Sequence, residues 1–316
     1  MKKTGITLLL ILFASVAALA QAPTLEIRTE TPGLPSELYY GNVKVKPVRL
    51  RPGTNQVITI DDVDFLVQEQ YIDFFARFPD SIGFKNWVAS IQGGVDGNGN
   101  IQPPCPNQGF GEFDAPNCDR VHMSAGFVQS YEFQGRGYWL LRSGYVGLNR
   151  SITDTTTGRS RRSSLTYAEF IPGLQQIGGS NSPAQEEAAK VVYINAFVQR
   201  SDFLALFPTS MTPSQYVNGL ESNAGVTLSN KQALIDGLTN GSMTRADVLR
   251  NIMESQVVFD KFIIPSFVDM EYKGYLRRDP DTIGYNNWID TLTANPSDYR
   301  HMVFGFIYST EYRSRF

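Results

Sequence analysis

The chain has 316 residues and a formal charge of −3, and 42% of its residues are hydrophobic. This apolar fraction excludes wholesale disorder, and a pI near 5.5 argues against a nucleic-acid-binding protein, which usually carries a basic excess. Two histidines and two cysteines leave little room for a His/Cys metal cage. Composition alone therefore indicates no biochemical activity.

The N-terminus has the pattern of a secretory signal peptide. Two lysines precede the apolar run Leu8–Val16, and Ala18-Leu19-Ala20 supplies the small residues that precede a cleavage site. We expect residues 1–20 to be removed before Gln21, which predicts a periplasmic or extracellular protein. The alternative is a membrane anchor, for which the apolar run is short. No later segment has the length and apolarity of a transmembrane helix.

Cys105 and Cys118 are the only cysteines, and they lie in one loop. In an oxidising compartment we expect them to form a disulfide, which would contribute about 3 kcal/mol for a loop of this length in the chain-entropy model. The alternative is a redox or metal-binding pair, although the spacing is not C-x-x-C.

Residues 21–60 are rich in proline and contain two alternating stretches, which predicts an extended arm or a small hairpin. From Asp61 onward the periodicity of apolar residues is helical. Capping-box or similar patterns, which mark helix starts, begin at Ser182, Thr212, Ser229 and Thr244.

The helical part contains internal repeats. Tyr71–Trp87 and Tyr272–Trp288 agree without a gap at ten of seventeen positions when Phe and Tyr are treated alike, so they are copies of one unit. A second shared pattern, H-M-x-x-G-F-x-x-S-x-E-[FY], begins at His122 and at His301. A divergent middle copy contains Tyr216 at the level of the tryptophans. We expect three helix–loop–helix–loop–helix units, at 61–180 (with the two-cysteine loop), 181–259 and 260–316.

The R-x-P-D-x-x-G-x-x-x-W unit followed by S-x-E-[FY] resembles the family called domain of unknown function 4214, over about residues 61–316. That family is bacterial, secreted and helical, and it is related to the phycobilisome linker domain. The resemblance implies an all-α fold of repeated helical units preceded by a short extended or β arm. It implies no activity, and the linker relatives favour a scaffold role.

The repeated polar, glycine and tryptophan residues have a structural interpretation. Arginine and Pro-Asp end one helix and begin the next, the arginine pairs with the glutamate that follows the third helix, and glycine lets a neighbouring helix approach the tryptophan four residues later. The alternative is an exposed anion-binding or sugar-binding site. The residues are Arg77, Asp80, Gly83, Trp87 and Glu132 in the first unit, and Arg278, Asp281, Gly284, Trp288 and Glu311 in the third.

Other features give weaker signals. Asp96, Asn98 and Asn100 resemble the front of a calcium loop, but the expected glutamate at the twelfth position is replaced by Asn107. We find no nucleophile elbow, H-E-x-x-H motif or Gly-rich phosphate loop, so we assign no catalytic residue, cofactor or firm metal site.

We therefore expect a secreted, non-catalytic interaction or scaffold module of the envelope or extracellular space, whose partner is an unknown protein or extracellular polymer and not a nucleic acid. The first alternative is a carbohydrate-binding or matrix-binding protein that uses exposed aromatic residues, with Tyr138 and Trp139 as candidates. The second alternative is an enzyme of unrecognised type.

Overall fold

The computed structural model describes residues 57–105, 119–180 and 182–316, and the backbone of short strands between residues 25 and 50. The predicted signal peptide and Cys118 lie outside the described residues. Cys105 is buried, and its disulfide with Cys118 stays a prediction.

The described part is mostly helical, as predicted. The helices are α1 (Val63–Phe75), α2 (Ser81–Gln92), α3 (Arg120–Gln129), α4 (Trp139–Gly147), α5 (Tyr167–Gly178), α6 (Pro183–Phe197), α7 (Ser201–Leu206), α8 (Pro213–Ala224), α9 (Lys231–Thr239), α10 (Arg245–Met253), α11 (Gln256–Tyr275), α12 (Thr282–Ala294), α13 (Tyr299–Tyr308) and α14 (Thr310–Arg313). A π-helix, η1 (Phe133–Tyr138), precedes α4, and a 3-10 turn, η2 (Pro296–Asp298), precedes α13.

Short antiparallel strands accompany the helices. In the N-terminal arm, β1 (Leu25–Arg28), β2 (Glu37–Tyr40) and β3 (Val43–Lys44) form one sheet, and β4 (Arg49–Leu50) pairs with β5 (Val57–Ile58). The expected extended arm is therefore present as strands. Two hairpins that the helical periodicity did not predict follow, β6 (Gly94–Val95) with β7 (Ile101–Gln102), and β8 (Arg150–Thr153) with β9 (Ser160–Ser163).

Side-chain caps fix several helix starts. Thr212 and Thr244 each form a capping box with the third residue of the helix, and the Ser182 hydroxyl accepts a hydrogen bond from the Gln185 amide. Each cap satisfies backbone N–H groups that have no partner within the helix. The predicted starts of α6, α8 and α10 are therefore confirmed, whereas the predicted cap at Ser229 is wrong, because α9 begins after Asn230 without a side-chain cap.

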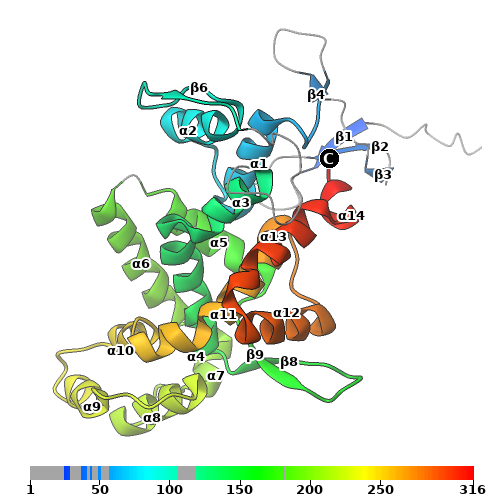
Figure 1. Cartoon of the computed structure of the whole chain (residues 1–316). Coiled ribbons are helices and arrows are strands. Elements are labelled where there is room, and N and C mark those ends of the chain that lie inside the picture. The colour runs from blue at the N-terminus through cyan, green and yellow to red at the C-terminus, as the bar shows by residue number, and fades with distance from the viewer. Residues whose placement is uncertain are drawn as a thin grey trace, which may run out of the picture.

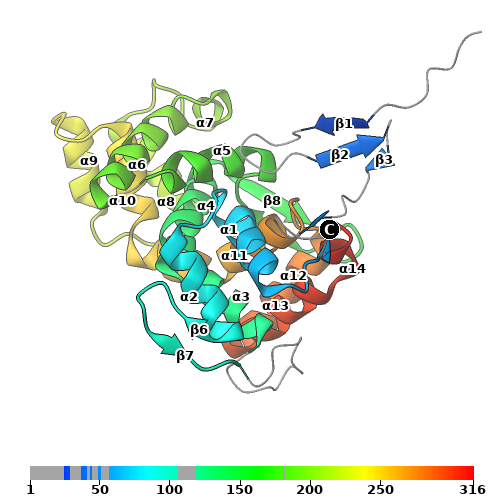
Figure 2. The same cartoon turned by 90° about the horizontal axis from the view of Figure 1, so that it is seen from above.

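The first and third units pack against each other through α1 and α11, which lie near the middle of the molecule (Figure 2). The ring of Phe74 meets that of Tyr275 edge to face at 4.8 Å, and a Cβ at Gly274 would overlap the Phe74 ring. The middle unit, α6 to α10, lies at the opposite side from the strands of the arm (Figure 1).

The last turn of α1 and of α11 is followed by a residue in the left-handed backbone region. Ala76 has φ 52° and Arg277, at the equivalent repeat position, has φ 53°. A residue with a Cβ is strained in this region. The helix ends of the first and third repeats therefore keep the same unfavourable turn, and Arg77 or Arg278 follows it.

We expect Ala76→Gly to stabilise the fold by about 0.5–1 kcal/mol, because glycine removes the left-handed strain and loses part of that gain to its greater freedom in the unfolded chain. The measurement is the free energy of unfolding in denaturant. Ala188→Gly, on the exposed face of α6, is the matched control and should destabilise by about 1 kcal/mol. Equal losses for both variants would contradict the strain argument.

Candidate functional site

The arginine–glutamate pair of the first unit is present. Arg77 Nε donates to Glu132 Oε1 at 2.9 Å, and Arg77 Nη2 donates to Glu132 Oε2 at 2.8 Å. Asp80 caps α2 by accepting hydrogen bonds from the amides of Ile82 and Gly83. The loop between α1 and α2 is thereby tied to the residues that follow α3.

The third unit repeats this arrangement. Arg278 donates to both carboxylate oxygens of Glu311 at 2.6 and 3.0 Å, and the Asp281 carboxylate accepts from the Gly284 amide at 2.8 Å. The hydrogen bond from Arg278 lowers the pKa of Glu311 below its ordinary value. This pair is more exposed than that of the first unit, so solvent screens it more strongly.

At both glycines the neighbouring helix that approaches closely is the preceding helix of the same unit. A Cβ at Gly83 would overlap the hydroxyl of Tyr71, and one at Gly284 would overlap that of Tyr272. Each glycine makes room for a tyrosine of the preceding helix, and in the first unit Tyr71 also contacts the Trp87 side chain by a hydrogen bond.

Trp87 also packs against α3. Its ring stacks on Phe127 with the centroids 4.6 Å apart, and a Cβ at Gly126 would lie 2.7 Å from the indole. Trp288 is held more loosely, with its ring 6.5 Å from that of Phe306. Both indoles are half-buried, so they pack at the margin of the core rather than in its interior.

The carboxylate of the calcium-loop candidate is occupied by its own loop. Asp96 Oδ1 accepts from the amides of Asn98 and Asn100 at 2.9 Å each, and Oδ2 accepts from Gln102 Nε2 at 3.0 Å. This arrangement is an Asx-type turn that closes the β6–β7 hairpin. Across the described residues, no group of three or more His, Cys, Asp or Glu side chains is arranged to hold a metal ion.

Tyr138 and Trp139 are not the exposed aromatic residues that the carbohydrate-binding hypothesis required. Each is only 2% exposed. Trp139 Nε1 donates to Glu254 at 2.6 Å, which joins α4 to the end of α10. Both side chains belong to the core because η1 continues directly into α4 and turns this segment inward.

Large apolar side chains are exposed around α2 and the β6–β7 hairpin, which lies at the edge of the molecule (Figure 1). Val95 and Ile101 are paired across the hairpin, and the backbone of Gly97, at its turn, lies against Ile82. We call this set the first-repeat apolar surface. Its members and their exposed fractions are Phe78 (69%), Ile82 (53%), Val95 (64%), Ile101 (84%) and Tyr131 (76%).

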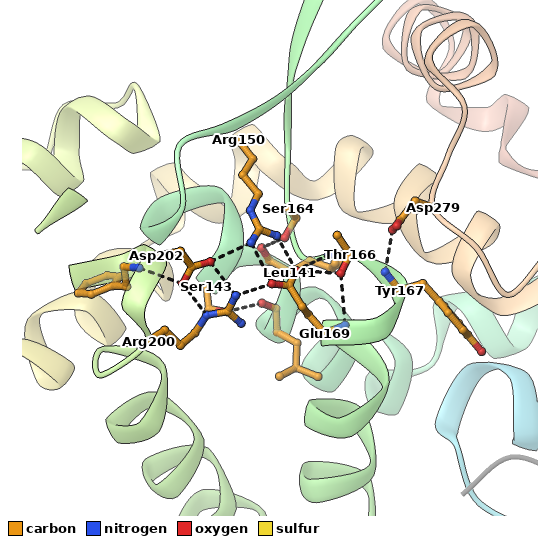
Figure 3. Close-up of polar contacts among 12 residues, drawn as sticks. Leu141, Ser143, Arg150, Ser164, Thr166, Tyr167, Glu169, Arg200, Asp202 and Asp279 are labelled. Atoms are coloured by element: carbon orange, nitrogen blue, oxygen red, sulfur yellow. Dashed lines mark hydrogen bonds and ion pairs between the residues drawn. The ribbon is translucent and has the colours of Figure 1, made fainter. Parts of the chain in front are cut away.

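A network of charges that the sequence analysis missed joins three segments (Figure 3). Arg150, in β8, donates to Glu169 and to Asp202 Oδ2, the latter at 2.9 Å, and Arg200 also pairs with both acids. Burial alone would raise the pKa of Glu169, but hydrogen bonds from Arg150, Thr166 and Arg200 hold it far below the ordinary value. These residues are distant in sequence, so no local sequence motif predicts the network.

Glu271 is a second feature that the sequence analysis missed. It is fully buried in α11, and neither carboxyl oxygen has a hydrogen-bond partner among the described residues. Its repeat equivalent, Gln70, bonds with Ser124 and Tyr312. The counterparts of those partners in the other copy are Val303 and Phe133, which offer no hydrogen-bonding group. Burial therefore raises the pKa of Glu271 well above its ordinary value.

The two arginine–glutamate pairs should differ in strength. A double-mutant cycle with Arg77→Met and Glu132→Gln should give a coupling energy of about 1 kcal/mol, and the same cycle on Arg278 and Glu311 should give less than about 0.5 kcal/mol, because the second pair is better solvated. Unfolding free energies of the single and double variants measure both couplings. A stronger coupling in the third unit would contradict this ordering.

Replacing Glu271 with glutamine should stabilise the protein at neutral pH. Burial raises the pKa of Glu271 in the folded protein. Its contribution to the free energy of unfolding is therefore fully present below the pKa of Glu271 in the unfolded chain, and it is lost as pH rises toward the folded-state pKa. Glu271→Gln removes that loss, so its advantage should grow as pH rises above about 4, the ordinary pKa of a glutamate side chain. Denaturant unfolding of the parent and the variant at several pH values measures it. A pH-independent difference would refute the burial of an ionisable Glu271.

No helix in the described part of the chain combines the length and the apolarity needed to cross a bilayer. No curated protein and no solved structure matches the chain. Residues 265–316 match the family model described as Domain of unknown function (DUF4214). That segment runs from the second half of α11 through α14 and carries the Arg278–Glu311 pair. The C-terminal repeat of this chain is therefore a DUF4214 domain.

Proposed function

We propose that this protein is a secreted, non-catalytic interaction module of the envelope or extracellular space, and that it binds a protein partner through the first-repeat apolar surface. The observation that carries the proposal is the exposure of five large apolar side chains in one repeat, two of them paired across the β6–β7 hairpin. Several exposed large apolar side chains in one part of a soluble protein are typical of an interaction surface.

The internal repeats support a specific role for this surface. Phe78 is 69% exposed, whereas the residue at its position in the third unit is Asp279. Both copies form the same arginine–glutamate pair beside this position. The shared fold therefore does not require phenylalanine at this position. An exposed phenylalanine side chain lowers solubility and adds nothing to the core.

The surface also has the composition of a binding interface. Phenylalanine, tyrosine and isoleucine side chains bury large apolar areas on association. The adjacent Arg77–Glu132 pair is satisfied within the protein, so a partner would not need to neutralise an isolated charge. The rigid α2 and the hydrogen-bonded β6–β7 turn hold these side chains in place, which lowers the entropic cost of binding.

Export is part of the proposal. It rests on the lysine, apolar and Ala-Leu-Ala pattern of residues 1–20 and on the two-cysteine loop. The carbohydrate-binding alternative in its aromatic form loses its basis, because Tyr138 and Trp139 are buried.

The test is a cross-linking pull-down from the native culture with the mature chain carrying a photoreactive residue at position 101. We expect a discrete protein adduct. The double variant Val95→Asp and Ile101→Asp, with the reactive group moved to position 82, should weaken capture by at least about tenfold, because it places charges at the centre of the apolar surface.

Ile283→Asp provides the matched control. Ile283 is 55% exposed and occupies the position in the third unit that Ile82 occupies in the first, so this variant adds a charge at an equally exposed isoleucine outside the surface. Its capture should remain unchanged. Equal loss in both variants, or no loss in the hairpin variant, would rule out the first-repeat apolar surface as the binding site.

A further inference from the structure

A cavity of about 390 Å³ with polar and apolar lining residues lies between the β8–β9 hairpin and the C-terminal half of α11. Its lining comes from β8, from the segment that follows β9, from α11 and from the loop before α12. Arg150, Ser164, Thr166 and Asp279, four of its lining residues, appear in Figure 3. The cavity is separate from the first-repeat apolar surface.

Three charged side chains of the third unit meet at this cavity. Lys273 is 2% exposed, and its Nζ donates to Asp269 and, at 3.0 Å, to Asp279 Oδ1. An ammonium group has three donors, and the third has no partner among the described residues. The same Asp279 oxygen also accepts from the Tyr167 amide at 2.7 Å, while Asp279 Oδ2 accepts no hydrogen bond in the described structure.

The first repeat builds the same helix end without these charges. The positions equivalent to Asp269, Lys273 and Asp279 hold Gln68, Ile72 and Phe78. Removing a lysine and an aspartate from water carries a large desolvation penalty, and Ile72 shows that the fold is satisfied by an apolar residue at the lysine position. The charged set is therefore an addition to the third repeat that the shared fold does not explain.

Hydroxyl groups complete the lining. Ser151, Ser163 and Thr282 lie on different sides of the cavity, from β8, the end of β9 and the start of α12. Their hydroxyls form no hydrogen bond with another described residue. Each can both donate and accept, so the cavity offers several adaptable polar groups beside one free ammonium donor and one free carboxylate oxygen.

The charges of the lining balance. Arg150 and Lys273 oppose Asp269 and Asp279, and the Arg150 guanidinium is already paired with Glu169 and Asp202. An anionic ligand would find no unpaired cation, and a cationic ligand would compete with Lys273. Charge complementarity therefore favours a neutral, polar ligand.

We propose that this cavity binds a neutral polyhydroxyl compound with the chemistry of a sugar ring. One ring hydroxyl accepts from Lys273 Nζ and its neighbour donates to Asp279 Oδ2. The hydroxyls of Ser163 and Thr282 bond with further ring hydroxyls, and Ile152, Leu165 and Pro280 face the C–H groups. No aromatic ring lines the cavity, so recognition depends on hydrogen bonds and the affinity is modest.

The experiment uses the full mature chain with D-glucose, D-galactose, D-mannose and N-acetyl-D-glucosamine as neutral probes, observed by saturation-transfer NMR and titrated to give dissociation constants. Glucuronate and glucosamine serve as charged analogues. We expect at least one neutral sugar to bind with a millimolar dissociation constant, and the charged analogues to bind more weakly than the neutral sugars.

The double variant Ser163→Ala and Thr282→Val should raise the dissociation constant by at least about fivefold, since it removes two hydrogen-bonding groups from the lining. Ser81→Ala, at the first-unit position equivalent to Thr282, is the control and should bind as the parent does, and circular dichroism checks that each variant folds. The absence of binding by all four neutral sugars, a preference for a charged analogue, or unchanged binding by the double variant would each overturn the proposal.

Discussion

The packing of α1 against α11 is the constraint on which the rest of the described structure depends. The two helices approach closely because Gly274 leaves room for the Phe74 ring. The contact is then fixed by charge, since the buried carboxylate of Asp73 in α1 accepts hydrogen bonds from Arg277 and Arg315 of the third unit. A buried carboxylate is tolerated only with such partners, so the chain's C-terminal residues have to return to α1 for the first and third units to be joined.

This joint lets the two copies share a framework and differ elsewhere. The arginine–glutamate pairs and the aspartate caps recur in both, whereas the exposed face of the helix end carries Phe78 in one copy and Asp279 in the other. The buried positions diverge too, with Ile72 replaced by Lys273. Residues that hold the unit together are repeated, whereas Phe78 at the apolar surface of the first copy and Lys273 and Asp279 at the cavity of the third differ from their equivalents.

The repeat pattern predicted the helical fold and the contacts that are local to one unit. Arg77 and Glu132 have an arginine and a glutamate at the equivalent positions of the third unit. A contact that both units share produces this pattern. The partner of Gly83, Tyr71, was not predicted, because sequence spacing places a residue on a helix face but does not tell which helix crosses that face. The cavity was missed because Ser163 and Lys273 come from segments that only the tertiary fold brings together, and because the short hairpins interrupt a helical periodicity.

The middle unit tests the interpretation of the repeated arginine as a structural clasp. It has no R-x-P-D sequence, yet Arg245, at the start of α10, donates to the carbonyl oxygens of Phe207 and Pro208 in the loop before α8, the latter at 3.0 Å. Its guanidinium also lies over the Tyr216 ring at 4.0 Å from the centroid. An arginine again joins the loop to the third helix. In the middle unit this arginine belongs to the third helix, whereas in the first and third units it belongs to the loop. A ligand site would require the same chemical groups at the same positions in each unit. A structural clasp requires only that the loop be joined to the third helix. All three units meet this weaker requirement.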